Sequence, residues 1–206
     1  MDRAVNIARG GMLRAGQTLT RATRTLCIRL GVDAAVLPMC DTEVTTCIRS
    51  GDEVLHFQDY WVGRQGKVEI SEIMRKCEVP PVATQEALAA IHDADAVIIG
   101  PSNPVTSISP ILECEGIIDA LRDQTVVVVS PFIGDAAVSG PAAALMEAWG
   151  MAPSSAATFD LYREFADIYI QDIRDPNALP HAIQMDTLMT DLEAAISLAE
   201  GIQAQL

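Results

Sequence analysis

The chain has 206 residues, half of them hydrophobic and a fifth charged, which is enough apolar material for a sizeable core. This balance excludes an intrinsically disordered or fibrous protein. No uninterrupted apolar run approaches the roughly 20 residues of a membrane-spanning helix. The net charge of −14 argues against nonspecific nucleic-acid binding, which needs a basic surface. We therefore expect a soluble globular protein without membrane or nucleic-acid partners.

The charge is unevenly distributed along the chain. Residues 1–30 contain six arginines and one acid, for a local charge of +5, whereas the rest carries 8 basic and 27 acidic residues, for −19. An Arg-rich, acid-poor beginning is typical of a mitochondrial transit peptide. A pair of helices explains it equally well, and we expect their arginines to face an anionic ligand, because an acidic protein that binds an anion needs a local positive field. For any single arginine, solvation of a helix face is an equally good explanation.

The cysteines predict a reducing compartment. Five of them are scattered without a CxxC pair, so neither a disulfide framework nor a zinc site is indicated. The first 30 residues also lack the apolar segment of a secretory signal. We expect a cytoplasmic protein.

The pattern of the first 80 residues predicts two helices, a short strand and a hairpin. The second helix ends at Gly31, a typical C-terminal glycine, and Gly10-Gly11 interrupts the first. A turn at residues 50–53 separates two alternating runs, which is a hairpin signal. In chain order, the elements are helices over 3–15 and 18–30, a strand over 34–39, and hairpin strands over 43–49 and 54–61.

After Pro80-Pro81 the pattern changes to an alternation of helices and apolar strands. The helices cover residues 85–93, 110–122, 141–149 and 187–204, and the strands 96–99, 125–129 and 168–170. We expect the last helix to bury one side, formed by Leu188, Leu192, Ala195, Ile196 and Ala199. Continuous apolar strands between helices predict an α/β fold with a mostly parallel sheet, covered by helices on both faces, plus the β-hairpin.

Ligands of such folds bind beyond the carboxyl ends of the strands, where two unusual loops lie. The first, Gly100-Pro101-Ser102-Asn103-Pro104 continuing to Ser107, combines a glycine with several hydrogen-bond donors. We expect it to contact a nucleotide, although an ordinary turn that caps the next helix explains it equally well. In the second, Ser139-Gly140-Pro141 opens a helix whose free amides could bind an anion; a plain helix cap is the favoured interpretation there.

A third candidate region surrounds the hairpin. Asp41 follows a predicted strand end, where a carboxylate could hold Mg²⁺ or hydrogen-bond a ligand. Strand alternation places His56, Gln58 and Tyr60 on one face, with Phe57, Asp59 and Trp61 on the other. A half-buried aromatic hairpin is the preferred interpretation of Phe57 and Trp61. GxGxxG, P-loop, GxSxG and HExxH motifs are all missing from the sequence, so no catalytic residue is assigned.

Several segments, in this order, resemble the CofD family, the 2-phospho-L-lactate transferases of coenzyme F-420 biosynthesis. The resemblance runs almost end to end, and the combination is specific although each piece alone is not. The segments are Asp2-Arg3-Ala4, the helix 19–31, Leu37-Pro38-Met39-Cys40-Asp41, His56-Phe57-Gln58-Asp59-Tyr60-Trp61-Val62, Ile99 to Pro104, Ser130-Pro131-Phe132-Ile133-Gly134, Val138-Ser139-Gly140-Pro141-Ala142, Ala166-Asp167-Ile168 with Asp172, and Asp186-Thr187-Leu188-Met189.

The resemblance implies a Rossmann-like transferase. Its donor would be a guanosine diphospho-activated acid, its acceptor the deazaflavin Fo and its cofactor Mg²⁺, and GMP would leave. It would transfer a phospholactyl or phosphoenolpyruvyl group. The nucleotide and substrate contacts that we expect, with metal ligands unassigned, are Gly100, Ser102, Asn103, Pro104, Ser107, Asp41, Gln58, Ser139 and Gly140.

The chain departs from the family at its beginning. The first strand and glycine-rich GGTG-type nucleotide loop of the family have no counterpart here, so residues 1–206 resemble the carboxyl-terminal two-thirds of one CofD-like domain. The match of residues 1–30 to interior helices weakens the transit-peptide interpretation. We expect an exposed sheet edge, a homo-oligomer or association with a chain that supplies the missing segment, and little activity from this chain alone. A non-catalytic nucleotide-sugar or dinucleotide binder like the YvcK regulators, or an inactive fragment, is the alternative.

Overall fold

A computed structural model describes residues 2–133, 136–137 and 141–206 of the chain. Its centre is a four-stranded parallel sheet in the order β4-β5-β8-β9. The three predicted strands are confirmed, and β9 is an addition that the sequence did not predict. The strands are β4 (Val97–Ile99), β5 (Val126–Val129), β8 (Ile168–Asp172) and β9 (Ile183–Met185).

Helices cover both faces of this sheet, as predicted. Val126 and Val128 pack with α3, α5 and α7, whereas Val127 and Val129 pack with α8 on the opposite face. Because successive residues of a strand point to opposite sides, this one apolar strand contributes to two cores. The helices are α3 (Gln85–His92), α5 (Ile117–Arg122), α7 (Ser155–Tyr162) and α8 (Leu192–Gln203).

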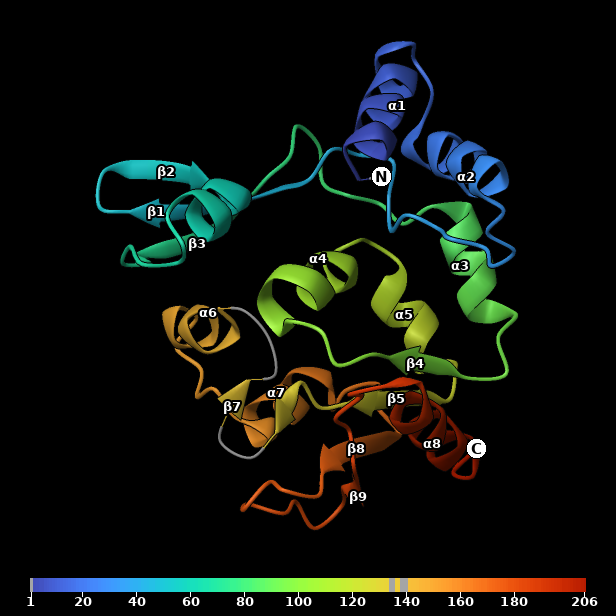
Figure 1. The fold of residues 1–206 in the computed structure, drawn as a ribbon, viewed down its shortest axis with the longest axis vertical. Helices are drawn as coiled ribbons and strands as arrows, with labels where there is room; N and C mark the ends of the chain where they lie inside the picture. Colours follow the sequence, from blue (N-terminus) through green and yellow to red (C-terminus); the bar gives the residue numbers. More distant parts are fainter. Residues whose placement is uncertain (1, 134–135, 138–140) are drawn as a thin grey trace.

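A separate antiparallel sheet of three strands contains the predicted hairpin. β1 (Thr45–Ser50) pairs with β2 (Glu53–His56) across a turn at Gly51, whose φ is 57°. The third strand, β3 (Glu72–Lys76), was not predicted and pairs with the other side of β1. In Figure 1 this sheet and α6 (Ala142–Ala148) lie on the side toward which the carboxyl ends of the parallel strands point.

A second core joins the antiparallel sheet to the loops at the parallel strands' carboxyl ends. Ile48 and Leu55 pack there with Val105, Phe132 and Leu145, all of them buried. Val105 belongs to η2 (Pro104–Ile108), a short π-helical turn after β4, and Phe132 to the small β6–β7 pair (Phe132–Ile133 and Ala136–Ala137). The hairpin is therefore anchored beside the edge where ligands of such sheets bind.

Two strand predictions are wrong. Residues 34–39 form no strand, and Val36 and Leu37 are exposed. The predicted alternation over 54–61 stops at His56, and a π-helical turn, η1 (Asp59–Gly63), follows. Tyr60 lies in this turn with its ring buried, and its hydroxyl donates to the Gly66 carbonyl (3.4 Å). Burial of this aromatic side chain therefore outweighs the alternating pattern that predicted a longer strand.

The remaining helices agree with the prediction in position but not in length. α1 (Asp2–Arg14) continues through Gly10-Gly11, and α2 (Leu19–Leu30) ends at Gly31 with a φ of 66°. The predicted helix over 110–122 is divided into α4 (Ser109–Leu112) and α5 by Gly116, whose φ is 96°. In the described parts of the chain, no helix combines the length and apolarity that crossing a membrane requires.

The buried side of the last helix differs from the prediction. α8 begins after Asp191, whose carboxylate accepts a hydrogen bond from the Ala194 amide (2.9 Å), so Leu188 lies outside it. Leu198 and Ile202 are buried against the sheet, whereas Leu192 and Ile196 are 74% and 46% exposed. Two apolar sides are available on this helix, and only packing against the sheet decides which one is buried.

Candidate functional site

The loop that follows β4 lies at the carboxyl end of that strand, as predicted. Asn103 organises it: its side-chain oxygen accepts hydrogen bonds from the amides of Val105 (2.9 Å) and Thr106 (3.1 Å). This is the geometry of a helix N-cap, and it begins η2. The interpretation of Asn103 as a capping residue is thus confirmed, and nucleotide contact by the same loop stays a prediction.

The loop is anchored on one side and open on the other. Pro104 and Val105 are buried, and the Ser109 hydroxyl donates to the Pro104 carbonyl (2.7 Å). Ser102 and Ser107 are exposed. The loop therefore presents two hydroxyl groups from a fixed backbone, which is a suitable arrangement for contacting a polar ligand.

The end of β5 is held by a buried network of hydroxyl groups. Ser130 accepts hydrogen bonds from the Phe132 amide (3.2 Å) and the Ser155 hydroxyl (2.9 Å), and the Tyr169 hydroxyl donates to the Ser155 carbonyl (2.8 Å). Burial raises the pKa of the Tyr169 phenol, although hydrogen bonds with the two serines lower it in part. The phenol therefore stays a neutral donor, and the network positions β5 against α7.

A fully buried carboxylate, Asp172, closes β8. Its two oxygens accept hydrogen bonds from the amides of Arg174 and Thr187 and from the Thr187 hydroxyl, each 2.9 Å long. Burial by itself raises the pKa of this carboxyl. The hydrogen bonds and the Arg174 charge together lower the pKa by more than burial raises it, so the net shift is downward. Asp172 is ionised and joins the loops after β8 and β9.

Asp172 was not among the predicted site residues. Its position at the end of an apolar strand was the available signal, since parallel strands end at the ligand-binding edge. Its partner Arg174 also contacts Asp186, so one guanidinium bridges two carboxylates. The sequence offers no way to predict that pairing, because the three residues lie on two different loops.

The other predicted site residues are spread over the molecule. Gly100 lines a 420 Å³ apolar cavity between β4 and α8. Asp41 lines a different cavity of 660 Å³ beside α1 and α2, and its carboxylate accepts a hydrogen bond from the Thr20 amide (2.7 Å) in the first turn of α2. Gln58 is exposed just after β2. Ser139 and Gly140 lie outside the described residues.

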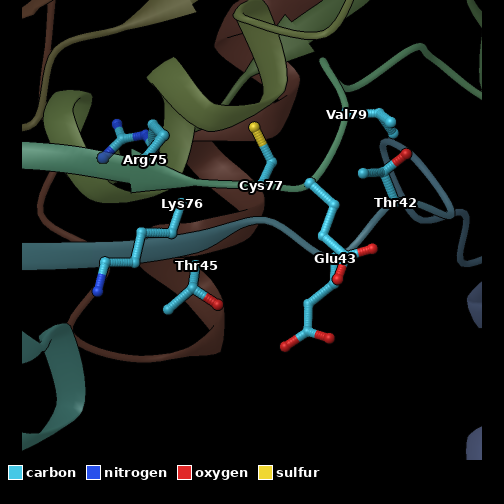
Figure 2. A pocket seen from close by; sticks show the side chains of 8 residues that line it. Thr42, Glu43, Thr45, Arg75, Lys76, Cys77 and Val79 are labelled. Carbon is cyan, nitrogen blue, oxygen red and sulfur yellow. The ribbon is translucent and has the colours of Figure 1, made fainter.

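A cavity of 820 Å³ opens where the antiparallel sheet joins the rest of the chain (Figure 2). It contains none of the predicted site residues. Figure 2 shows Arg75 and Lys76 at the end of β3, followed by Cys77, with Thr45 on the neighbouring strand β1 and Glu43 just before it. Its wall carries two cations, Arg75 and Lys76, and two acids, Glu43 and Glu78, so the cavity does not favour one class of ligand.

Two cations lie near the carboxyl ends of the parallel strands, and both are engaged within the chain. Arg75 donates to the Val105 carbonyl and pairs with Glu113 (3.0 Å), and Arg174 holds the two carboxylates described above. The six arginines of α1 and α2 are all exposed. Figure 1 shows these helices at the top of the molecule, apart from the loop after β4. Arg9 of α1 lines the 660 Å³ cavity together with Asp41, so contact between these arginines and an anionic ligand stays a prediction.

Mg²⁺ binding stays a prediction for this chain, and the described residues supply no complete set of protein ligands. Among residues 2–133, 136–137 and 141–206, no three His, Cys, Asp or Glu side chains converge as a metal would need. Asp41 and Asp172 both accept backbone hydrogen bonds. We therefore assign no ligands of this chain to the ion.

Comparison with known proteins agrees with this fold. A family model described as 2-phospho-L-lactate transferase CofD matches residues 1–195. Proteins named 2-phospho-L-lactate transferase from Methanocorpusculum labreanum and Methanospirillum hungatei are 48% and 44% identical, over 96% and 100% of this chain. The chain spans 66% and 69% of their lengths, about two thirds.

A solved structure shows the same fold at much lower sequence similarity. The crystal structure of a UPF0052-family protein from Bacillus halodurans is 17% identical, with a TM-score of 0.58 over 84% of this chain and 54% of that one. Together with the parallel sheet and the loop after β4, the family match over residues 1–195 leads to one conclusion: the chain belongs to the CofD family.

Proposed function

We propose that this chain takes part in transferring a phospholactyl or phosphoenolpyruvyl group to the deazaflavin Fo in coenzyme F-420 biosynthesis. The donor would be a guanosine diphospho-activated acid, and GMP would leave. The observation that carries the proposal is the CofD family match over residues 1–195. The names of the relatives, 2-phospho-L-lactate transferase, support the same reaction class.

The nucleotide would bind along the loop from Gly100 to Ser107. Three features of the loop support this: it follows a parallel strand, its backbone is anchored at Pro104, and Ser102 and Ser107 are exposed. Fixed donors lose little conformational entropy when a ligand binds. Asp41, Gln58, Ser139 and Gly140 remain proposed contacts of the complete site.

By itself, the chain should bind guanine nucleotide weakly and catalyse no measurable transfer. It spans about two thirds of the relatives' length, and Arg75 and Arg174 are engaged within it. Transfer at phosphorus depends on holding both substrates and stabilising the developing charge together. Loss of a few donors from such a site costs on the order of 10³-fold in rate or more.

A direct assay tests the proposal. The purified chain is incubated with Mg²⁺, Fo and the guanosine-activated acid, and GMP release is measured beside the full-length relative from Methanospirillum hungatei. We expect turnover from the relative and none from this chain, with activity recovered when the segment that the relative has in addition is supplied in trans. Turnover by the chain at the relative's rate would contradict its proposed incompleteness; no recovery with any added segment would contradict its part in the transfer.

A second candidate is nucleotide binding without catalysis. The observation that favours it is the use of Asn103, Ser130 and Asp172 to build the strand ends themselves. Calorimetric titration with GDP and with a nucleotide sugar distinguishes the two candidates. Micromolar binding of a nucleotide sugar, together with no recovery of transfer in trans, supports the binder.

A further inference from the structure

We propose that Arg75 is the positioning residue of the loop from Gly100 to Ser107, because its guanidinium supplies the hydrogen-bond donor that the Val105 carbonyl otherwise lacks. The proposal rests on the proposed function, since Ser102 and Ser107 of this loop are proposed nucleotide contacts. Arg75 acts through the loop and does not touch the nucleotide itself. Its side chain is only 13% exposed, and its three nitrogens are engaged within the chain.

The Val105 carbonyl lacks a main-chain donor because a proline stands at the position that would supply one. In η2 the Ile108 amide donates to the carbonyl of residue 103 (3.1 Å) and the Ser109 amide to that of residue 104, five positions earlier in each case. The next bond in this series would join residue 110 to Val105, but Pro110 has no amide hydrogen. Because Val105 is fully buried, its carbonyl needs a donor from elsewhere in the chain.

Arg75 of β3 supplies that donor from the antiparallel sheet. One terminal nitrogen, Nη2, donates to the Val105 carbonyl. The other, Nη1, donates to the hydroxyl of Thr46, its cross-strand neighbour on β1 (3.3 Å). Nε pairs with Glu113 at the end of α4 (3.0 Å). A single guanidinium thus holds both ends of the segment 104–113, and the one nitrogen of a lysine cannot reach all three partners.

The guanidinium also contacts an aromatic ring. Trp149, which follows α6, lies with its ring centroid 6.0 Å from Cζ of Arg75, within the range of a cation–π contact. Figure 2 shows the side chains of Arg75 and Lys76 on opposite sides of β3, so Lys76 does not compete for these partners. Arg75 therefore links β1, η2, α4 and the end of α6 from one position on β3.

Val105 is the residue through which this order reaches the proposed nucleotide contacts. Its amide donates to the Asn103 side chain (2.9 Å) and its carbonyl accepts from Arg75, so both of its polar main-chain groups are held. Ser107 lies two residues after Val105, and Ser102 lies three residues before it. Fixed donors lose less conformational entropy on binding than mobile ones. Loss of the Arg75 guanidinium therefore weakens nucleotide binding without removing a group that touches the nucleotide.

Hydrogen exchange at the loop amides, measured by NMR without nucleotide, tests the positioning role. The amides of Val105 and Thr106 donate to Asn103 and report on the order of the loop. In Arg75→Met we expect them to exchange about tenfold faster or more, because a buried carbonyl has lost its donor. The amides of β5 should keep their native rates, as they do when the sheet stays folded. Unchanged exchange at Val105 and Thr106 would overturn the proposal.

Arg75→Lys separates the hydrogen-bonding geometry from the charge. Its loop amides should exchange at rates between those of the native chain and Arg75→Met, because lysine keeps the charge and one donor but reaches fewer partners. Rates equal to those of Arg75→Met would contradict the donor role. If Arg75→Met does not fold, Arg75→Lys is compared with the native chain alone, and native rates at the loop amides would then overturn the proposal.

Arg49→Met is the matched control. Arg49 lies on β1 of the same sheet, and its guanidinium bonds to Glu72 (2.8 Å) and Met74 within that sheet. Its replacement should leave exchange at the loop amides unchanged. Equal acceleration in Arg49→Met and Arg75→Met would show that any lost cation of the sheet loosens the loop, which contradicts a specific role of Arg75.

Titration with GDP, followed by NMR, tests whether the order of the loop serves nucleotide binding. We expect the dissociation constant of Arg75→Met to exceed the native value about tenfold or more, and that of Arg49→Met to match it. Equal affinity of Arg75→Met and the native chain would overturn the proposal. No binding of GDP by the native chain would instead contradict the nucleotide part of the proposed function, and the exchange rates would still decide whether Arg75 orders the loop.

Discussion

The parallel sheet and the α1–α2 hairpin use their apolar residues in opposite ways. Val126 to Val129 of the sheet are at most 2% exposed, whereas Ile28 of the hairpin is 71% exposed and Ile7 70%. β5 of the sheet is buried on both faces by helices from this same chain. The comparison shows that one region is stabilised by its own packing and that the other leaves large apolar side chains exposed.

The largest expected effect comes from the buried carboxylate at the edge of the sheet. Asp172→Ala leaves the amides of Arg174 and Thr187 and the Thr187 hydroxyl without their acceptor, and we expect a loss of about 3 to 5 kcal/mol in the free energy of unfolding. Chemical denaturation measures it. The matched control is Asp160→Ala, which removes an exposed ion pair with Arg163 and should cost at most about 1 kcal/mol.

The effect of Asp172 should depend on pH in a defined direction. Its folded-state pKa is lowered, so its contribution is fully present above the ordinary aspartate pKa and is lost as pH falls through the lower folded value. The difference between the native chain and Asp172→Asn should therefore be constant near neutral pH and shrink in acid. A difference that grows in acid would contradict the assigned hydrogen bonds.

An aliphatic pair compares the two regions directly. Ile170 of β8 is fully buried against α8, so Ile170→Ala should lower the free energy of unfolding by about 2 to 5 kcal/mol. The same substitution at Ile28 should change stability by less than about 0.5 kcal/mol. Both are measured on dilute protein, where association does not contribute. Equal costs at the two positions would show that the hairpin is packed within the monomer after all.

The capping residue of the loop after β4 should have a smaller effect on stability. Asn103→Ala removes the acceptor for two amides and should cost about 0.5 to 2 kcal/mol. If the loop contacts nucleotide, guanine-nucleotide affinity should fall by about 1 to 3 kcal/mol as well. Ser102→Ala, which changes only an exposed side chain, serves as the comparison for stability, and calorimetric titration measures the affinity.

The smallest effects are expected from single arginines of the hairpin on nucleotide affinity. Arg14, Arg21 and Arg24 are exposed, so replacing any one by glutamine should change the affinity by less than about 0.5 kcal/mol at two salt concentrations. A marked change in affinity or in its salt dependence would show that these charges act on the bound phosphates, as the charge distribution alone first suggested.

Much of the fold could be predicted because local patterns were strong. The run Val126 to Val129 and the turn glycines Gly31 and Gly51 identified a strand, a helix end and a hairpin. β3 and β9 were not predicted, because each is stabilised by pairing with a strand that is distant in the sequence.

The candidate site was less predictable than the fold. The position of the Gly100 loop at a strand end followed from the sequence alone, and so did the two roles that Asn103 can have. Asp172 could not be identified in the same way, because its importance depends on Arg174 and Thr187 coming within hydrogen-bond distance. Sequence spacing reveals which residues are near a strand end, but not which of them are already satisfied by the protein itself.

By itself, the sequence determined the class of fold, the position of the Gly100 loop at a strand end and the opposite charges of residues 1–30 and the rest of the chain. These follow from hydrophobic periodicity, turn residues and the distribution of acids and bases, all of which are local properties. The tertiary structure decided which side of α8 is buried, that the alternating pattern ends at His56, and that the Asp172 carboxylate is held by hydrogen bonds. Each of those outcomes depends on which residues, distant in the sequence, pack against or hydrogen-bond to a given residue. The free energy of such tertiary contacts cannot be read from the local sequence pattern.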